Sequence, residues 1–331
     1  MSIIKLNLDQ IFKLAKDVMI SNGCNEENAD ALADIIMRAE RDGSHSHGLF
    51  RVPGYVKSLR SGKVNGKAKP KVNIKAQSVI CLDGDCGFAP LAQKVGLPKL
   101  ALSAKKNGIS ILSLTNIHHF AALWPETEYL ASENLIGIAC TCYMPAVAPS
   151  GTKEKFFGTN PFSFSYPIPG LSPICFDMAT SAMSLGDIQI AAREKTKIPM
   201  GTGLDSSGKF SDNPSEILKG VLLPFGGYKG SAIALMVELL SAGLTGDNFS
   251  YEAKENDNAD GGPPKGGEMI IAISPSIIAG KNWEDHVLKF YKKIKDLEGI
   301  RIPGERRHQN RLNRNKRPVD KKLYETIQRL L

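Results

Sequence analysis

The sequence predicts an α/β (α+β) fold with a mostly antiparallel sheet and a helical part built from both ends of the chain. The first 42 residues carry two amphipathic helical patterns. From residue 79 to residue 273, short apolar runs alternate with helical segments, but their spacing is too uneven for a regular βαβ series. No Gly-x-Gly-x-x-Gly follows an early strand, so a Rossmann domain is not expected.

Helix signals place the N-terminal elements. Asp9 can cap a first helix that Gly23 ends, and Asn25 can start a second helix whose apolar residues share one face. A polar elbow over residues 42–48 follows, and no packing requirement accounts for its composition. We expect a short apolar helix after the elbow, ending at residues 61–62.

The middle of the chain supplies the sheet. Strands are expected at 79–82, 109–114, 137–143, 173–178 and 269–273, with a helix over 91–106. Glycine and proline mark loops at 224–227 and 261–267. The phrase from Phe225 to Ser231 opens an apolar helix over 232–240. Its backbone N–H groups and Lys229 could hold an anion, although a plain loop-to-helix junction is an equal alternative.

Composition excludes several classes of protein. The 331 residues are 42% hydrophobic, which suits a globular chain of one large or two smaller domains. No run of 18 apolar residues and no signal peptide is visible, so we expect a cytoplasmic protein with no membrane partner. The six cysteines lack the spacing of a redox pair or a zinc knuckle, and we expect reduced thiols.

The formal net charge of +8 is concentrated near the C-terminus. Residues 301–322 contain nine Lys or Arg against two acidic residues, and no aromatic residue is interleaved before Tyr324. Because bases would find no stacking platform there, we expect no nucleic-acid partner. A solvated basic tail is the main interpretation, and recognition of a phosphate group is the alternative.

Two histidine pairs indicate chemistry, His45-x-His47 in the elbow and His118-His119 after a strand. A structural histidine satisfied by hydrogen bonds is the usual alternative. No HExxH or equivalent spacing is present, so no metal site is expected. Arg51 follows His47 by four residues, on the same face if the segment is helical. An imidazole that handles a proton beside a guanidinium that binds a carboxylate suits a 2-oxo or 2-imino acid.

Several motifs together resemble those of one family. The run Ser46-His47-Gly48-Leu49-Phe50-Arg51 resembles the Ser-His-Gly-x-x-Arg signature of the malate/L-lactate dehydrogenase family that lacks a Rossmann fold. That family's His-Phe, Thr-Asn-Pro, Asp-Met, Lys-Gly and Pro-Gly-Glu-Arg phrases recur in order at 119–120, 159–161, 177–178, 229–230 and 303–306. Within the family, residues 50–55, 118–124, 186–188 and 222–234 look like the Δ1-piperideine-2-carboxylate/Δ1-pyrroline-2-carboxylate reductases. Hydroxy-acid dehydrogenases usually carry lysine where Asp187 stands.

The resemblance implies roles for residues of this chain. Ser46, His47 and Asp187 would form the proton relay, with Arg51 and Thr159 on the substrate carboxylate. Contacts with the cofactor would come from four segments: His119, Phe120, Ala121, Ala122 and Leu123; Asp177, Met178 and Ala179; Tyr228 and Lys229; and Arg301, Ile302, Pro303, Gly304, Glu305, Arg306 and Arg307. His45 stands where many members have aspartate, so the surroundings of the relay are expected to differ. The alternative to a catalytic role for Asp187 is that of a carboxylate at the start of a helix.

The resemblance also implies a function and an architecture. We expect NADPH-dependent reduction of small cyclic 2-imino acids, with NADH possible as cofactor and His47 as proton donor. A carboxylate at 187 would stabilise the cationic character of an imine, whereas a lysine would suit a ketone. The basic residues after 300 would pair with a 2′-phosphate and so favour NADPH. A 2-hydroxy-acid dehydrogenase and a non-catalytic relic are the alternatives. Residues 76–280 would form a non-Rossmann NAD(P)-binding domain, with 1–75 and 281–331 as a helical substrate and dimerisation part of a homodimer.

Overall fold

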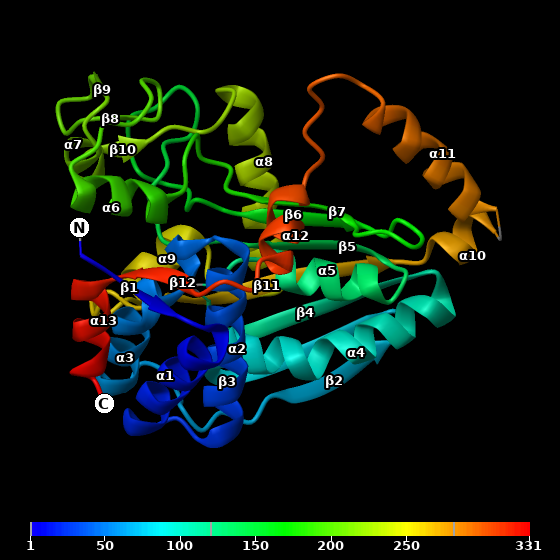
Figure 1. The fold of residues 1–331 in the computed structure, drawn as a ribbon, viewed down its shortest axis with the longest axis horizontal. Helices are drawn as coiled ribbons and strands as arrows, with labels where there is room; N and C mark the ends of the chain where they lie inside the picture. The colour runs from blue at the N-terminus through cyan, green and yellow to red at the C-terminus, as the bar shows by residue number, and fades with distance from the viewer. Residues whose placement is uncertain (1, 120, 281) are drawn as a thin grey trace.

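The computed structural model describes residues 2–119, 121–280 and 282–331. Phe120, an expected cofactor contact, lies outside these residues. The expected α/β class with a mostly antiparallel sheet is confirmed, because the sheet is built from antiparallel pairs with a single parallel one (Figure 1). None of the helices described is long and apolar enough to cross a membrane.

The central sheet has seven strands in the order β2-β3-β4-β11-β5-β6-β7. Only β3 and β4 pair in parallel. The strands are β2 Lys71–Ala76, β3 Val79–Phe88, β4 Ile109–His118, β5 Ile136–Thr141, β6 Phe162–Tyr166, β7 Ile174–Met178 and β11 Lys265–Ile273. This order differs from the all-parallel 3-2-1-4-5-6 arrangement of a Rossmann domain.

Helices cover both faces of this sheet. On one face, α4 (Ala89–Asn107) and α5 (Trp124–Ser132) pack on alternate strand residues such as Leu112 and Leu114. On the other face, α8 (Tyr228–Glu238) and the π turn after it pack on the intervening residues, among them Ile111 and Met269. The alternation of side chains along each strand therefore gives the sheet two buried faces.

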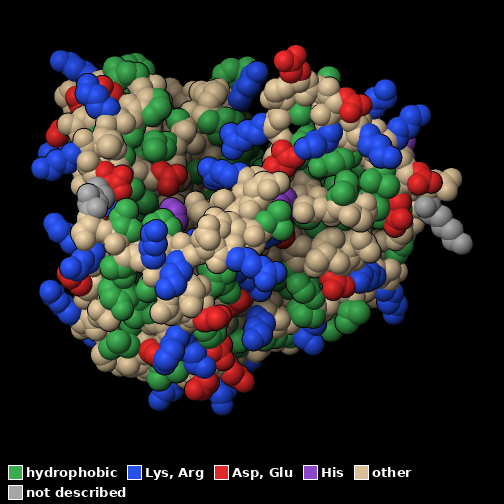
Figure 2. All heavy atoms as spheres, in the orientation of Figure 1, with side chains coloured by type: hydrophobic (Ala, Val, Ile, Leu, Met, Phe, Trp, Pro, Cys, Tyr) green, Lys and Arg blue, Asp and Glu red, His purple; other side chains and the backbone are tan. Residues whose placement is uncertain are grey.

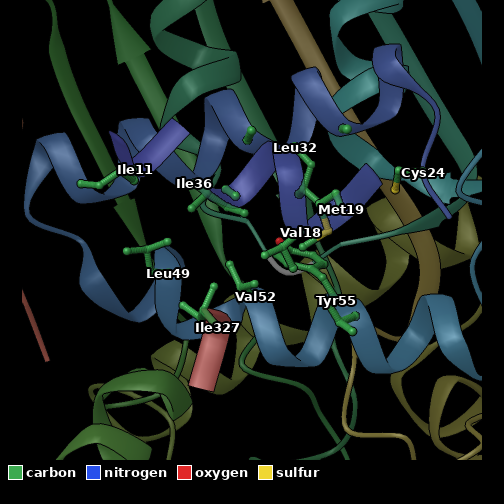
Figure 3. Packing of buried hydrophobic residues seen from close by; sticks show 14 of the residues in the cluster. Ile11, Val18, Met19, Cys24, Leu32, Ile36, Leu49, Val52, Tyr55 and Ile327 are labelled. Carbon is green, nitrogen blue, oxygen red and sulfur yellow. The ribbon is translucent and has the colours of Figure 1, made fainter. Parts of the chain in front are cut away.

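A separate core joins the N-terminal helices to the C-terminal one. Helices α1 (Leu8–Ser21), α2 (Glu26–Asp42), α3 (Val52–Arg60) and α13 (Lys321–Gln328) point their apolar side chains toward one another (Figure 3). Strand β1 (Ile3–Leu6) pairs with β12 (Arg317–Asp320) beside them. The cap of α1 is Asn7 instead of the expected Asp9, since the Asn7 side chain accepts from Gln10 and Gln10 returns the bond.

Two peripheral units complete the molecule. A three-stranded sheet, β10-β8-β9, lies with α6 (Leu185–Glu194) and α7 (Pro214–Lys219) at the upper left of Figure 1. Its strands are β8 Gly203–Leu204, β9 Phe210–Ser211 and β10 Val221–Leu222. Helices α10 (Pro275–Ala279) and α11 (Trp283–Lys295) lie at the upper right, while α9 (Ser250–Glu255) and α12 (Glu305–Leu312) lie nearer the centre.

The basic C-terminal stretch is not simply a solvated tail. Arg311 donates to the fully buried Asp42 at 2.6 Å and to Glu128 at 2.6 Å. Arg317, also buried, donates to main-chain carbonyls that include those of Asn310 and Arg41. Arg311 and Arg317 therefore bind the C-terminal segment to α2, and Arg311 also binds it to α5.

Candidate active site

The expected catalytic and substrate-binding residues line one cavity of about 840 Å³. The cavity lies between the elbow that follows α2, the lobe that carries α6, the ends of β4 and β7, and the segment 306–323. Figure 2 shows the molecule hollowed between the α6–α8 lobe and α12, with Lys or Arg side chains along the hollow. Ser46, His47, Arg51, Thr159 and Asp187 all contribute to its walls.

Glu40 organises the elbow from inside the molecule. One carboxylate oxygen lies 2.6 Å from His45 Nδ1, and the other accepts from the Leu49 N–H at 2.8 Å. A Cβ on Gly48 would lie 2.1 Å from Glu40 Oε1, so glycine is required for this approach. The hydrogen bond to Glu40 raises the pKa of His45, and His45 lines the same cavity as the proton relay.

His47 lies in a cationic and poorly solvated position. Its Nδ1 is 3.2 Å from Ser46 Oγ, and His45–His47 forms a 3₁₀ turn that places both side chains. Burial, with Arg51 and His119 nearby, lowers the pKa of His47 to about 3. The ring is therefore neutral in the substrate-free site, and Ser46 can donate to Nδ1 when Nε2 carries the proton.

Arg51 reaches the same cavity from the next turn. The segment Leu49–Arg51 is a second 3₁₀ turn instead of the start of the α-helix, which begins at Val52. Arg51 Nε donates to the Ser46 carbonyl at 2.7 Å, and its guanidinium lies 5.5 Å from the centroid of the Phe50 ring. These contacts hold a planar cation beside the imidazole, the arrangement that suits recognition of a carboxylate.

Asp187 enters the cavity from the first turn of α6. Ser184 caps this helix by accepting from the Asp187 N–H at 3.1 Å. Asp187 therefore does lie at a helix start, as the structural alternative for this carboxylate requires. Asp187 is nevertheless exposed to the cavity, on the wall that faces His47 and Arg51. The backbone of Gly186 touches this wall directly, because a Cβ there would lie 2.9 Å from Arg51 Nη2.

A second wall carries many of the expected cofactor contacts. His119, Ala121, Ala122, Asp177, Met178 and Ala179 line it. Half-buried Asp177 accepts from the Leu123 and Trp124 N–H groups at 2.7 and 3.0 Å, so this carboxylate shapes the turn that leads into α5. Burial raises the pKa of Asp177 and lowers the pKa of His119 to about 4.

Only some of the remaining expected cofactor contacts line the cavity. Arg306 and Arg307 line the cavity, Arg307 being fixed by the Cys175 carbonyl at 2.8 Å and by the Trp124 ring. The other residues lie outside its walls: Leu123, Tyr228, Lys229, Arg301, Ile302, Pro303, Gly304 and Glu305. Tyr228 and Lys229 do open α8, as the sequence indicated, but both are exposed.

Sequence reasoning missed several residues of the cavity. Tyr143, Thr141 and Arg193 line it, and Arg193 stacks on Phe50 at 5.7 Å from the ring centroid. Burial raises the pKa of Tyr143 to about 12, so its hydroxyl stays protonated and able to donate. Their only sequence signal is position, since Thr141 lies within the strand expected over 137–143 and Arg193 follows Asp187 by six residues on α6.

Comparisons with known proteins agree on one family. A family model described as malate/L-lactate dehydrogenase matches residues 6–328. The chain is similar to a Δ1-pyrroline-2-carboxylate/Δ1-piperideine-2-carboxylate reductase of Pseudomonas putida, 40% identical over 94% of this chain and 91% of that protein. The crystal structure of Δ1-piperideine-2-carboxylate reductase from Pseudomonas syringae superposes with a TM-score of 0.93 at 39% identity, covering 99% and 100% of the two chains. Sulfolactate dehydrogenase from Methanocaldococcus jannaschii gives 0.89 at 32% identity, covering 99% and 96%.

Proposed function

The chain belongs to the malate/L-lactate dehydrogenase family, and from that premise we propose that it reduces small cyclic 2-imino acids with a reduced nicotinamide cofactor. One observation carries the proposal: a neutral, half-buried His47 and the fixed guanidinium of Arg51 line a cavity that also exposes the carboxylate of Asp187. The products would be L-pipecolate and L-proline, from the six- and five-membered rings.

The cavity suits a nicotinamide cofactor beside a small acid. Its volume of about 840 Å³ falls in the range of sites that bind small molecules and cofactors. When bound, a reduced nicotinamide supplies the hydride. His119, Ala121, Ala122 and the segment 177–179 would hold it, and the exposed Arg306 at the rim could pair with a 2′-phosphate. On this basis we propose NADPH as the preferred cofactor.

Arg51 would hold the substrate by its carboxylate. The bond from Nε to the Ser46 carbonyl fixes the plane of the guanidinium before substrate arrives. The hydroxyl of Thr159, on the same cavity, would complete the carboxylate site. A preorganised cation of this kind costs little side-chain entropy when the anion binds.

His47 would donate the proton, and its low pKa explains how. Before a substrate binds, the Arg51 cation helps to keep the imidazole neutral. A substrate carboxylate on Arg51 would cancel part of that charge, which raises the pKa of His47 and lets it take up a proton together with the substrate. Ser46 would hold Nδ1 while the opposite ring nitrogen exchanges the proton with the imine nitrogen. Asp187 would stabilise the cationic nitrogen that results.

An NADPH-oxidation assay tests the proposal. It offers Δ1-piperideine-2-carboxylate, Δ1-pyrroline-2-carboxylate, pyruvate and oxaloacetate side by side, with NADPH and NADH in parallel. We expect kcat/KM to be highest for a cyclic imine with NADPH. A preference for the oxo acids, or for malate or lactate oxidation, would establish the hydroxy-acid dehydrogenase alternative. Inactivity toward every substrate would favour the non-catalytic alternative.

We also propose that the protein works as a cytosolic homodimer, the assembly that the family resemblance implies. Exposed apolar side chains on α8 and the turn after it, Leu235, Met236 and Leu239, support this, since such a surface suits contact with another subunit. Light scattering coupled to size exclusion should give twice the monomer mass of 35.9 kDa. A monomer mass at micromolar concentration would contradict it.

A further inference from the structure

Three buried side chains from different parts of the chain meet behind the active-site cavity. His119 follows β4, Glu126 lies in the first turn of α5, and Glu268 lies on β11, which pairs with β4. They are 8%, 1% and 0% exposed, and one ligand atom from each lies within 4.8 Å of the other two. The fold therefore gathers an imidazole and two carboxyl groups in the protein interior.

These carboxyl groups lack the partners that buried charges require. Among the described residues, no group lies in hydrogen-bonding geometry with either side-chain oxygen of Glu126 or with Glu268 Oε1. The Gln93 amide donates to Glu268 Oε2 at 2.8 Å and lies 3.1 Å from His119 Nε2. A buried, unpartnered carboxylate is strongly unfavourable, so the group must be neutralised by a proton or by a cation.

The surrounding charges do not neutralise the pair. Arg38 attracts Glu126 from a distance, but its Nε is bound to Asp34 at 2.8 Å. Asp177 adds a further negative charge near Glu126. Burial raises the pKa of Glu268 to about 8, and burial together with Glu268 raises that of Glu126 well above its usual range. The pKa of His119, about 4, leaves a neutral imidazole able to bind a cation.

We propose that His119, Glu126 and Glu268 form a binding site for one divalent transition-metal ion such as Zn²⁺ or Mn²⁺. Imidazole nitrogen with two carboxylate oxygens is a ligand set that these ions accept, and the ion's charge balances both carboxylates. A half-turn of the Gln93 amide replaces its nitrogen by its oxygen and offers a fourth ligand. Sequence spacing did not reveal this site, because its members come from three separate elements.

The site is reachable from a face other than the active-site cavity. Glu126 and Gln93 line a second cavity of about 510 Å³ between α2, α4 and α5. Asp30, Asp34, Arg38 and Lys94 also line that cavity, so its walls carry charges of both signs. His119 also lines the active-site cavity, so the metal ion lies in the wall between the two. Its role is structural, since it ties β4, β11 and α5 together and fixes the His119 ring.

The first test measures metal binding and does not depend on turnover. Protein stripped with a chelator is titrated with Zn²⁺ and with Mn²⁺ by calorimetry at pH 7.5, for wild type, Glu126→Gln, Glu268→Gln and the control Glu133→Gln. Glu133 ends α5 on the surface, paired with Lys105. We expect one ion per chain, at least tenfold weaker binding in the first two variants, and unchanged binding in the control. Absence of stoichiometric binding, or equal affinity in all four proteins, would overturn the proposal.

Two further measurements keep the proposal testable if a variant fails to fold. In buffers of different ionisation enthalpy, wild-type metal binding should release about one proton at pH 7.5, because the ion displaces the proton held by the pair. The zinc X-ray absorption spectrum should show nitrogen and oxygen ligands only. Sulfur ligation would assign the ion to some of the six free cysteines instead and refute the site.

Discussion

Replacing Gly186 by alanine should damage the active site while leaving the helix intact. Gly186 lies in the first turn of α6, where its backbone packs on Ser46 and Arg51. An added Cβ would lie 2.9 Å from Arg51 Nη2 and 3.0 Å from Ser46 Cβ, against 3.4–4 Å for ordinary contact. Either the guanidinium or the start of α6 must therefore move by roughly half an ångström, and Asp187 moves with the helix.

The magnitude follows from that displacement. A misplacement of about 1 Å in a reacting arrangement costs on the order of 100-fold in rate, so a shift of half that size should cost about tenfold in kcat/KM. Stability should respond differently. Alanine is favoured over glycine within a helix by about 1 kcal/mol, which offsets the local crowding and should keep Tm within a few degrees of wild type.

The assay is NADPH oxidation with the best cyclic imine, together with thermal unfolding of the same preparations. Gly266→Ala is the matched control, because a Cβ on Gly266 meets nothing within 4 Å. We expect a loss of kcat/KM in Gly186→Ala alone. Wild-type kcat/KM in Gly186→Ala would show that the contact between α6 and the elbow does not position the site, and our reasoning would be wrong.

Four other outcomes are expected. His47→Ala should lower kcat by about 10²- to 10⁴-fold with cofactor affinity nearly unchanged; wild-type turnover at every pH would exclude it as proton donor. Arg51→Ala should lose about 2 to 4 kcal/mol in kcat/KM, part of it in KM for the acid. Arg51→Lys should recover only part of this loss, since an ammonium lacks the planar fork of the guanidinium; equal activity of Arg51→Lys and wild type would mean that Arg51 binds no carboxylate. The ratio of kcat/KM for a cyclic imine to kcat/KM for pyruvate should fall from wild type through Asp187→Asn to Asp187→Lys. The fall in Asp187→Lys should be at least about tenfold, because the new lysine places a cation near the cationic imine. A ratio that stays constant across the three proteins would favour the hydroxy-acid alternative. Burial lowers the pKa of His118 to about 4, below the value of about 6.5 in the unfolded chain. The free energy of unfolding should therefore fall as pH drops from 6.5 toward 4, and it should fall less steeply in His118→Asn. Denaturant titrations that give parallel pH profiles for the two proteins would contradict this.

Local signals predicted the elbow because its residues are neighbours in the sequence. Ser46, His47 and Arg51 lie within six positions, and the turn itself places them on one cavity. Asp187 came from the family resemblance, and its distance along the chain hides the contact that Gly186 makes with the elbow. The His119, Glu126 and Glu268 cluster left no sequence pattern at all, since only strand pairing brings β4 and β11 together.

The fold was predicted where hydrophobic periodicity is strong. Strand β2 was not predicted from the sequence. It is an edge strand with exposed Lys71, Asn73 and Lys75, and such a strand carries little apolar signal. The cap of α1 was placed two residues late, since both Asn7 and Asp9 are good caps and only the reciprocal bond with Gln10 decides between them. The prediction of a solvated basic tail at the C-terminus was incomplete for another reason. Whether an arginine is solvated or buried depends on a distant acid, here Asp42 for Arg311.

The pairing of β1 with β12 has a consequence for how the protein is made. Ile3 is registered against Asp320, and residues 3, 318–320 and 323 line the same cavity as His47. Most of the chain must therefore leave the ribosome before this cavity can close. A nascent chain that has emerged only as far as α8 can form the elbow, but it still lacks β12 and α13, which complete the wall of the cavity. Until then, the exposed edge of β1 and the apolar faces of α1 and α3 are surfaces for a chaperone to cover.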